Sequence, residues 1–225
     1  MICIVQARMS SKRFPGKTMK SLVKKTLLQR VLNRIEFSKK IDKIIVATST
    51  SKKDDQIEKF CIKNNYTIYR SNLNNVVKRF EGTINKFNIK DFIRISADSP
   101  LLDAKIIDQA INIYKKKKPD IVTNVFPRTF PKGQSVEIIN SNIFLKFSKK
   151  ITSKECKEHI TKYFYKNHKK FNIINFTFKK KIKDINLSID TKKDFQNIEK
   201  IIKYMNDKNI SLKNIIKIRK KIDLQ

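Results

Sequence analysis

The stretch ICIVQARMSSKRFPGKTM, at residues 2–19, places a cation-rich loop directly after an apolar run. The run Ile2–Ala7 is almost entirely apolar, which predicts a strand that is buried on both faces of a sheet. Arg8, Arg13 and Lys17 follow within a few residues, and a Pro-Gly pair turns the chain at the end of the loop. Three cations therefore stand at the end of a buried strand, where they face either solvent or an anionic ligand.

Apolar runs alternate with helical patterns along the first 125 residues. After the opening loop, TLLQRVLNRIEF places its apolar residues on one face of a helix. Strands are expected at KIIVATS, YTIYR, DFIRIS and DIVTNV, with a helical segment between successive strands. Asp54 is expected near the amino terminus of the second helix. This alternation predicts an α/β fold with a mostly parallel sheet and helices on both faces.

The length and composition indicate one compact domain. The chain has 225 residues, of which 40% are hydrophobic, so it can bury a real core. It has only 3 Gly and 5 Pro and no flexible linker. Beyond Val125 the pattern becomes mixed, with strands expected around QSVEIIN, FNIINFTF and DINLSID, a helix through KECKEHITKYFYKN, and two closing helices. We expect this part to continue the same sheet.

The formal net charge of +32 is spread along the whole chain. This spread favours a compositional bias over selection for a polyanionic partner. The 3 cysteines are far apart and form no CxxC pair, so neither a disulfide framework nor a zinc knuckle is expected. The amino-terminal apolar run is too short for a signal peptide, and no stretch approaches the roughly 20 apolar residues of a membrane span. We therefore expect a cytoplasmic protein without a membrane anchor or a specific nucleic-acid partner.

The opening loop has the features of an anion site. A loop that leaves a central strand presents backbone N–H groups that can surround an anion. The Arg13 guanidinium can fork onto phosphate oxygens, Lys17 can act as a point charge, and Gly16 permits the turn. These features predict a triphosphate-binding loop, although the spacing of a Walker A loop is absent. The alternative is a solvated basic loop in a basic protein.

Two aspartates follow predicted strands. Asp98 comes directly after DFIRIS, where a carboxylate that faces a phosphate loop can hold Mg²⁺ together with phosphate oxygens. The alternative role is that of a helix N-cap, which Asp103 fits better. Asp190 in LSIDTKKDF precedes a helix, so it is either an N-cap or a second metal ligand beside Asp98.

Seven motifs, in their order along the chain, resemble the cytidylyltransferase family that activates sugar acids. They are VQARMSSKRFPGKTM, DKIIVATS, YRSN…NVVKRF, IRISADSPLLD, GQSVEI, KEHIT and LSIDTKKDF, and they extend to about Tyr204. This family includes the CMP-sialate and CMP-Kdo synthetases, and the chain is most similar to its spore-coat-polysaccharide-type branch. The resemblance implies a Rossmann-like, three-layer nucleotidyltransferase fold of the glycosyltransferase-A-like kind. We expect a single domain, 1–225, with a nucleotide-binding half at 1–125 and an acceptor-binding lobe at 126–205. The segment 206–225 carries none of these motifs and is expected to form a C-terminal basic helix of unknown role.

The resemblance also implies an activity for surface polysaccharide biosynthesis, with CTP as donor, Mg²⁺ as cofactor and an acidic sugar as acceptor. A sugar hydroxyl would attack the α-phosphorus in line and release pyrophosphate, so the protein would mainly position groups and neutralise charge. A homodimer is common in such families. By position, the resemblance assigns the nucleotide to Ala7, Arg8, Ser10, Arg13, Lys17, Arg70 and Arg79, the metal to Asp98 and Asp190, the acceptor to Glu137 and His159, and catalysis to Arg13, Lys17 and Asp98.

Three departures from the family pattern stand out. Ala97 precedes the metal aspartate where relatives usually have Gly, Ser135 lies where they tend to have Asp, and Lys157 replaces the Arg of an Arg-Glu-His motif. Lysine cannot reproduce the bidentate fork of arginine. The last two departures fall on the acceptor side, which leaves another acidic acceptor, such as a phosphonate, as an alternative. A basic nucleic-acid-binding protein on a Rossmann-like scaffold is the alternative from a different class.

Overall fold

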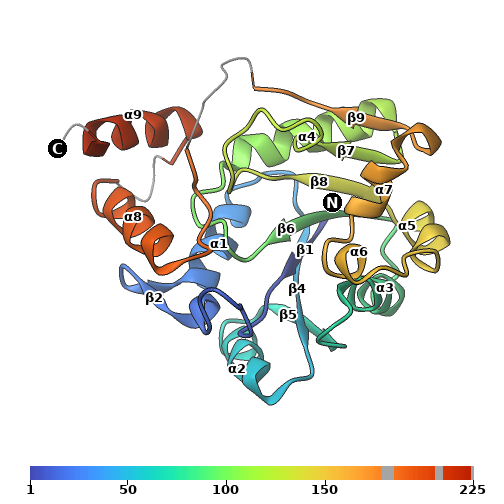
Figure 1. The fold of residues 1–225 in the computed structure, drawn as a ribbon, viewed down its shortest axis with the longest axis horizontal. Coiled ribbons are helices and arrows are strands. Elements are labelled where there is room, and N and C mark those ends of the chain that lie inside the picture. The colour runs from blue at the N-terminus through green and yellow to red at the C-terminus, as the bar shows by residue number, and fades with distance from the viewer. Residues whose placement is uncertain (179–184, 206–209, 224–225) are drawn as a thin grey trace.

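A computed structural model describes residues 1–178, 185–205 and 210–223. Its centre is a seven-stranded sheet in the order β5-β4-β1-β6-β8-β7-β9, and β2 and β3 form a small separate hairpin (Figure 1). The strands span Ile2–Gln6 (β1), Ser21–Leu22 (β2), Lys25–Thr26 (β3), Lys43–Ser49 (β4), Thr67–Ser71 (β5), Asp91–Ser96 (β6), Ile121–Thr123 (β7), Glu137–Asn140 (β8) and Ile173–Asn175 (β9). The predicted α/β class with a mostly parallel sheet is confirmed.

One strand of the sheet runs against the others. β8 is antiparallel to both of its neighbours, β6 and β7, whereas the remaining pairs are parallel. The carboxyl ends of six strands and the amino end of β8 therefore meet at one edge, which we call the carboxyl edge. The sequence pattern placed DIVTNV at the end of a regular series, but β8 lies between β6 and β7. Ligands of such sheets bind at the carboxyl ends of the strands.

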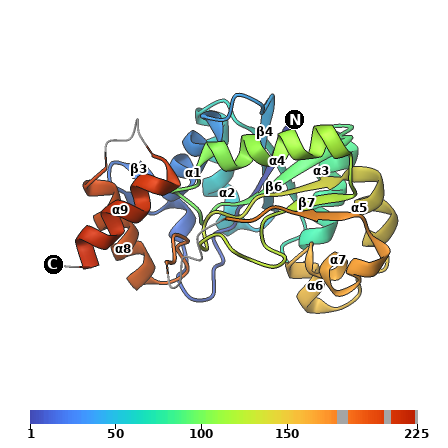
Figure 2. The same ribbon diagram turned by 90° about the horizontal axis from the view of Figure 1, so that it is seen from above.

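Helices cover both faces of the sheet, and further helices lie at the two ends of the molecule. They span Leu27–Glu36 (α1), Asp55–Lys63 (α2), Val76–Lys86 (α3), Ala104–Lys117 (α4), Ser141–Ser148 (α5), Lys154–Glu158 (α6), Lys162–Lys166 (α7), Lys192–Lys203 (α8) and Leu212–Asp223 (α9), with short 3₁₀ turns at Lys17–Met19, Lys52–Asp54 and His168–Lys170. Figures 1 and 2 show α8 and α9 together at one end of the molecule and α5, α6 and α7 at the other. None of the helices in the described ranges is long and apolar enough to span a membrane.

The two faces of the sheet bury two separate apolar clusters. Side chains alternate along β1, so Cys3 and Val5 join the cluster under α1 and α4, while Ile4 joins the cluster under α3 and α5. The apolar face that was predicted for TLLQRVLNRIEF is fully buried in α1. Packing on both faces explains why the run Ile2–Ala7 is apolar without alternation.

The part of the chain beyond Val125 differs locally from its pattern. The helix expected through KECKEHITKYFYKN is divided into α6 and α7, because the turn between them carries Ile160 into the core. The segment Asn186–Asp190 makes only an isolated bridge between Asn186 and Lys132, so it is not the strand that DINLSID suggested. α9 lies inside the predicted C-terminal basic helix, of which residues 206–209 and 224–225 are outside the described residues.

Gly133 allows two loops of the carboxyl edge to pack closely against each other. Its φ of +86° lies in the left-handed region, and a Cβ atom there would sit 2.4 Å from the backbone carbonyl of Leu187. The neighbouring Lys132 carbonyl accepts a 2.9 Å hydrogen bond from the Leu187 N–H. Only glycine permits this approach, since a side chain would meet both strain and backbone.

We expect Gly133→Ala to lower the free energy of unfolding by roughly 3 kcal/mol, because left-handed strain and overpacking add. Gly16→Ala is the matched control, since Gly16 also has a positive φ of 74° but its Cβ would meet nothing closer than Met9 Cε at 3.9 Å. That control should lose only about 1–2 kcal/mol. Urea denaturation of both variants measures the difference, and equal losses would contradict the close approach of the two loops.

Candidate active site

Four loops converge at the carboxyl edge of the sheet. The loop after β1 starts beside β6, where the Ala97 N–H donates to the Gln6 carbonyl at 3.0 Å. The loop after β6 contacts the segment before α8 through the Ile189 N–H and the Asp98 carbonyl at 2.9 Å. The loop between β7 and β8 joins them through Gln134, whose side chain bonds the Leu101 carbonyl at 2.7 Å. Segments that are distant in sequence are thereby brought to one place.

A buried carboxylate holds the loop after β1 in position. Asp54 is fully buried, and its Oδ1 accepts a 2.7 Å hydrogen bond from the Met9 N–H. Its Oδ2 accepts from the N–H and the hydroxyl of Ser49 at the end of β4. Although Asp54 precedes α2, its side chain makes no capping bond to that helix. The sequence placed Asp54 at a helix terminus and missed this role, because its partners come from two distant loops.

Lys17 and Arg13 converge on the carboxylate of Asp190. Lys17 Nζ lies 3.2 Å from Asp190 Oδ1 and also donates to the Ile189 carbonyl. Arg13 Nη2 lies 3.0 Å from Asp190 Oδ2. The Lys17 side chain is 11% exposed, whereas that of Arg13 is 65% exposed, so Arg13 is the more accessible charge. The structure therefore brings together three residues that the sequence assigned to one site.

Asp190 is not the cap of α8. The N-cap is Thr191, whose hydroxyl accepts from the Asp194 N–H while the Asp194 side chain reaches back to the Thr191 N–H. This capping box satisfies the first turn of the helix without Asp190. The N-cap alternative for Asp190 is therefore wrong, and its carboxylate is available to cations.

Asp98 has an open carboxylate at the same edge. The only side chain that bonds it within the described ranges is Ser99, whose hydroxyl donates to Oδ1 at 2.9 Å. The N-cap of α4 is Asp103, as the sequence suggested, and its second oxygen also accepts the Leu212 N–H. No cluster of three or more acidic, His or Cys ligands occurs in the part of the chain that the structure describes. Mg²⁺ needs only one or two carboxylates when phosphates complete its shell. Asp98 and Asp190 have the chemistry for such an ion, and their assignment to the metal stays a prediction.

Arg8 connects the opening loop to α6. Its guanidinium forms a fork with Glu158, in which Nη1 lies 3.1 Å from Oε2 and Nη2 contacts Oε1. Ala7 is buried and continues the backbone pairing of β1 with β4. Ser10 lies half-buried in the same loop. The three residues share the loop, and their assignment to a nucleotide stays a prediction.

The two remaining arginines of the predicted site lie in different surroundings. Arg70 bonds the carbonyls of β4 and its loop, and its charge is neutralised by Asp55 and Glu58 on α2. Arg79 is 1% exposed, donates to the carbonyls of residues 72 and 73, and its Nε has no hydrogen-bond partner among the described residues. Burial lowers the pKa of Arg79, while the nearby Asp54 opposes that shift. Arg79 therefore lies near the opening loop, and Arg70 is already committed to α2.

Glu137 is the centre of a buried polar cluster in the region that the sequence assigned to the acceptor. It is 2% exposed and accepts hydrogen bonds from Arg94 Nη1 and from the Tyr165 hydroxyl. Arg94 also donates twice to Gln6 Oε1 at 3.2 Å. Burial and the Glu137 charge both raise the pKa of Tyr165, so its hydroxyl stays protonated. Both oxygens of Glu137 thus have protein partners.

Sequence reasoning named Glu137 and His159 for the acceptor but missed the partners of Glu137. His159 is exposed at the carboxyl terminus of α6, and nothing in the described ranges joins its side chain to Glu137. Arg94 could have been found from sequence, since it is a charge inside the apolar strand DFIRIS. Tyr165 could not, because its pattern is that of an ordinary helix.

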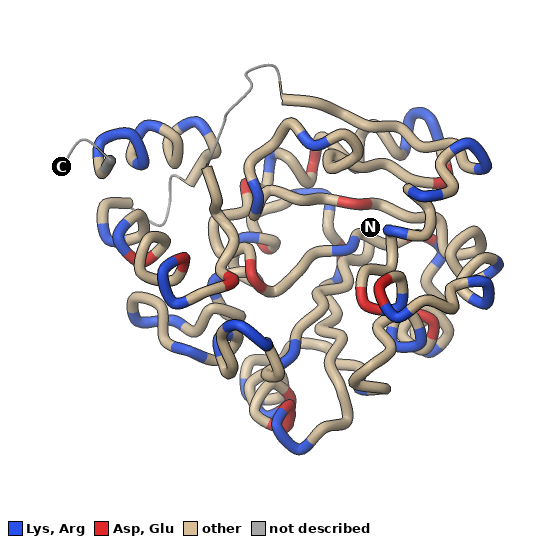
Figure 3. The backbone as a smooth tube through the Cα atoms, in the orientation of Figure 1, with Lys and Arg blue, Asp and Glu red and all other residues tan. Residues whose placement is uncertain are grey.

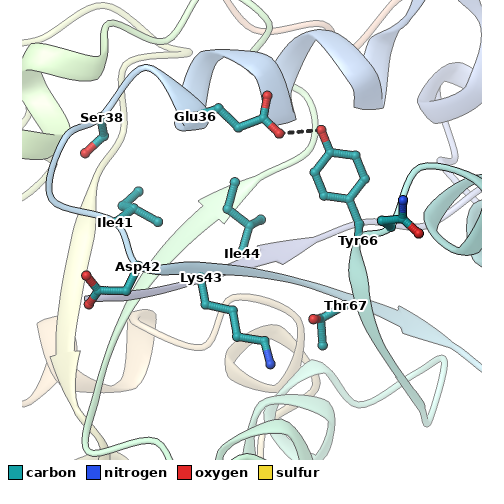
Figure 4. Close-up of a pocket in the computed structure, with 9 residues that line it drawn as sticks. Glu36, Ser38, Ile41, Asp42, Lys43, Ile44, Tyr66 and Thr67 are labelled. Atoms are coloured by element: carbon teal, nitrogen blue, oxygen red, sulfur yellow. Dashed lines mark hydrogen bonds between the residues drawn. The ribbon is translucent and has the colours of Figure 1, made fainter.

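A surface pocket lies at the opposite edge of the sheet. It is lined by the end of α1 and the beginnings of β4 and β5, where Tyr66 donates to Glu36 at 2.6 Å (Figure 4). None of the residues assigned to the site lines this pocket. The candidate active site is therefore the loop cluster at the carboxyl edge.

Comparison with known proteins supports the same conclusion. A family model described as cytidylyltransferase matches residues 2–222. The spore coat polysaccharide biosynthesis protein SpsF of Bacillus subtilis is 28% identical over 207 residues, which cover 88% of this chain and 85% of SpsF. The structure of a cytidylyltransferase from Leptospira borgpetersenii is 29% identical, covers 99% of this chain and 95% of its own, and superposes with a TM-score of 0.93.

A more distant structure shares the fold alone. It is a CMP:2-keto-3-deoxy-manno-octonic acid synthetase solved in complex with CTP, 12% identical, with a TM-score of 0.70 over 90% of this chain and 98% of its own. The predicted nucleotidyltransferase fold and the resemblance are both confirmed. Since the family model spans nearly the whole chain and the loop cluster sits where such folds bind ligands, this protein belongs to the cytidylyltransferase family and is a nucleotidyltransferase enzyme.

Proposed function

We propose that this enzyme transfers CMP from CTP to a sugar acid and releases pyrophosphate, for the synthesis of a surface polysaccharide. The observation that carries the proposal is the convergence of Arg13 and Lys17 on Asp190 beside Asp98 at the carboxyl edge. Cations and carboxylates in one loop cluster suit a metal-bound triphosphate. The printed role of SpsF in spore coat polysaccharide biosynthesis supports the acceptor class.

The chain's own residues account for most of the chemistry in this proposal. Arg8, Arg13 and Lys17 hold the triphosphate and neutralise its charge, which favours departure of pyrophosphate. Arg13 and Lys17 exchange Asp190 for phosphate oxygens when the nucleotide binds. Asp98 and Asp190 would hold Mg²⁺, which when bound would neutralise negative charge on the phosphate oxygens. The acceptor hydroxyl is positioned in line with the α-phosphorus by the side of the site that contains Glu137.

The distribution of charge favours this enzyme over a nucleic-acid-binding protein. Lys and Arg occur on nearly every element and around the whole outline of the molecule (Figure 3). A nucleic-acid surface concentrates its cations on one face or stripe. The net charge of +32 is therefore read as compositional. We also propose that the enzyme works in the cytoplasm and forms a homodimer, and light scattering of the purified protein tests the dimer.

The central test is an assay of the purified protein with CTP, Mg²⁺ and a panel of sugar acids that includes 3-deoxy-manno-octulosonate. We expect release of pyrophosphate with at least one acid and loss of this release on chelation with EDTA. A labelled single strand titrated across a salt series provides the contrast, since phosphate contacts weaken steeply with salt. Tight strand binding at high salt, with no pyrophosphate from any acid, would overturn the proposal.

Arg13→Ala should lower turnover by about 10–100-fold, because one charge-assisted contact to phosphate is lost. Because the Arg13 side chain is exposed, the Arg13→Ala variant should melt at the same temperature as the parent protein. Lys12→Ala is the matched control, since Lys12 is an exposed neighbouring cation without a side-chain partner in the described ranges. Similar turnover in the two variants would show that Arg13 does not contact the phosphates.

Asp190→Asn should lower Mg²⁺-dependent turnover by roughly 100-fold, since a charge that faces the reacting phosphates is removed. Its stability should change little, because the cap of α8 is Thr191. Turnover across a Mg²⁺ titration and thermal melting measure the two effects. A variant that melts early but turns over normally would show a purely structural role.

Asp54→Asn should lower kcat/KM for CTP by roughly tenfold or more, because the loop after β1 loses its fixed position. An amide has only one accepting oxygen and cannot accept all three hydrogen bonds that the buried carboxylate accepts, so the unfolding free energy should also fall by about 1–3 kcal/mol. Asp55→Asn is the control, since Asp55 pairs with Arg70 near the surface. If KM for the acceptor rises while that for CTP stays unchanged, Asp54 does not position the nucleotide loop.

A further inference from the structure

Most cations at the carboxyl edge are already neutralised by carboxylates. Arg8 pairs with Glu158, Arg94 with Glu137, and both Arg13 and Lys17 with Asp190. Each of these charges must exchange a protein carboxylate before it meets a ligand.

Arg128 differs from these residues. Its Nη1 donates to the hydroxyl of Ser135 at 3.1 Å, and no carboxylate of the described residues pairs with it. The side chain is exposed, so a ligand can reach it. Although the residue is exposed, desolvation by the groups packed around its guanidinium lowers the pKa of that group, and the nearby Glu137 carboxylate and Tyr165 hydroxyl oppose that shift. Arginine stays protonated in proteins, so a positive charge stands near Glu137 and Tyr165 without a paired carboxylate among the described residues.

The loop that carries Arg128 is held by several hydrogen bonds. Asn175 at the end of β9 accepts from the Phe126 N–H at 3.3 Å and donates to the Pro127 carbonyl at 3.1 Å. The Thr129 hydroxyl accepts from the Phe178 N–H at 2.8 Å. The backbone on either side of Arg128 is thus fixed, which reduces the entropy lost when a ligand binds.

Ser135 is anchored just as firmly on the other side. The next residue, Val136, donates its N–H to the buried Asn124 side chain at 2.9 Å. Glu137 follows at the beginning of β8, so Ser135 lies at the carboxyl edge beside the polar cluster. A serine hydroxyl orients the guanidinium but leaves its charge uncompensated. A carboxylate at this position would occupy the fork that an external anion needs.

We propose that Arg128 binds the anionic group of the acceptor and that Ser135 keeps its guanidinium available for this contact. The inference rests on the proposed function and assigns a specificity-determining residue within it. A guanidinium binds a carboxylate through two parallel hydrogen bonds, so the preferred acceptor is a sugar with a carboxylate. A phosphonate presents similar oxygens to the same fork, and the test separates these two sources.

The experiment compares Arg128→Gln, Arg128→Lys and Ser135→Asp with the parent enzyme. KM and kcat are measured for CTP and for the best sugar acid of the panel, and in a second arm for its phosphonate analogue. Lys149→Gln is the matched control, since it removes an exposed charge at the end of α5, away from the carboxyl edge. Thermal melting of every variant, with and without acceptor, reports folding and binding separately from turnover.

We expect Arg128→Gln and Ser135→Asp to raise KM for the acceptor by about 10–100-fold, with KM for CTP changed less than about twofold. Arg128→Lys should recover part of the affinity, since it restores the charge without the fork. A larger loss for the carboxylate than for the phosphonate supports the carboxylate assignment, and the reverse order supports the phosphonate. If both substitutions leave the acceptor KM at the parent value, the role of Arg128 is wrong while the proposed function stands. If the parent enzyme releases no pyrophosphate with any acceptor, the proposed function fails and this inference falls with it.

Discussion

The hydrogen bonds of Asp54 are the interaction on which the site depends. A fully buried carboxylate has a large cost of desolvation, which this one offsets with donors from Met9 and Ser49. Those donors lie in the loop after β1 and at the end of β4, so one side chain fixes the spacing of these two segments. The loop that contains Arg8, Arg13 and Lys17 begins at this fixed point. Removing the carboxylate would leave the backbone N–H of Met9 without its partner.

Topology supplies the second constraint. Because β8 runs against its neighbours, its first residue, Glu137, lies at the same edge as the ends of β1 and β6. The Glu137 cluster and the cationic loop can therefore lie at one edge although they are far apart in sequence. Gln6 links them directly, since its side chain accepts from Arg94 while its backbone belongs to the strand that leads into the loop.

Ion pairs at this edge prepare the site for anions. Asp190 holds Arg13 and Lys17 close together, which would otherwise repel each other. In the proposed reaction, an incoming triphosphate would offer the same oxygen chemistry with more charge, so exchange of partners would be favourable once a divalent ion compensates the carboxylates. The site thus keeps its cations ordered in the absence of ligand. Arg128 is positioned in a different way, because hydrogen bonds to the backbone fix the loop that carries it.

Local patterns in the sequence were enough to predict the fold class and the opening loop. Apolar runs such as Ile2–Ala7 and the amphipathic face of α1 are local patterns, and burial on one or two faces follows from them directly. The cations of the opening loop and the position of Asp98 after a strand are equally local, and the ordered motifs were enough to identify the family.

Contacts between distant segments could be read only from the tertiary structure. Asp54 looked like a helix-terminal residue and Tyr165 like part of a helix, since neither has a local signal for its partner. Thr191, not Asp190, is the N-cap of α8, so Asp190 lies outside the helix and beside Lys17. The composition of the segment does not specify at which of these two residues the helix begins.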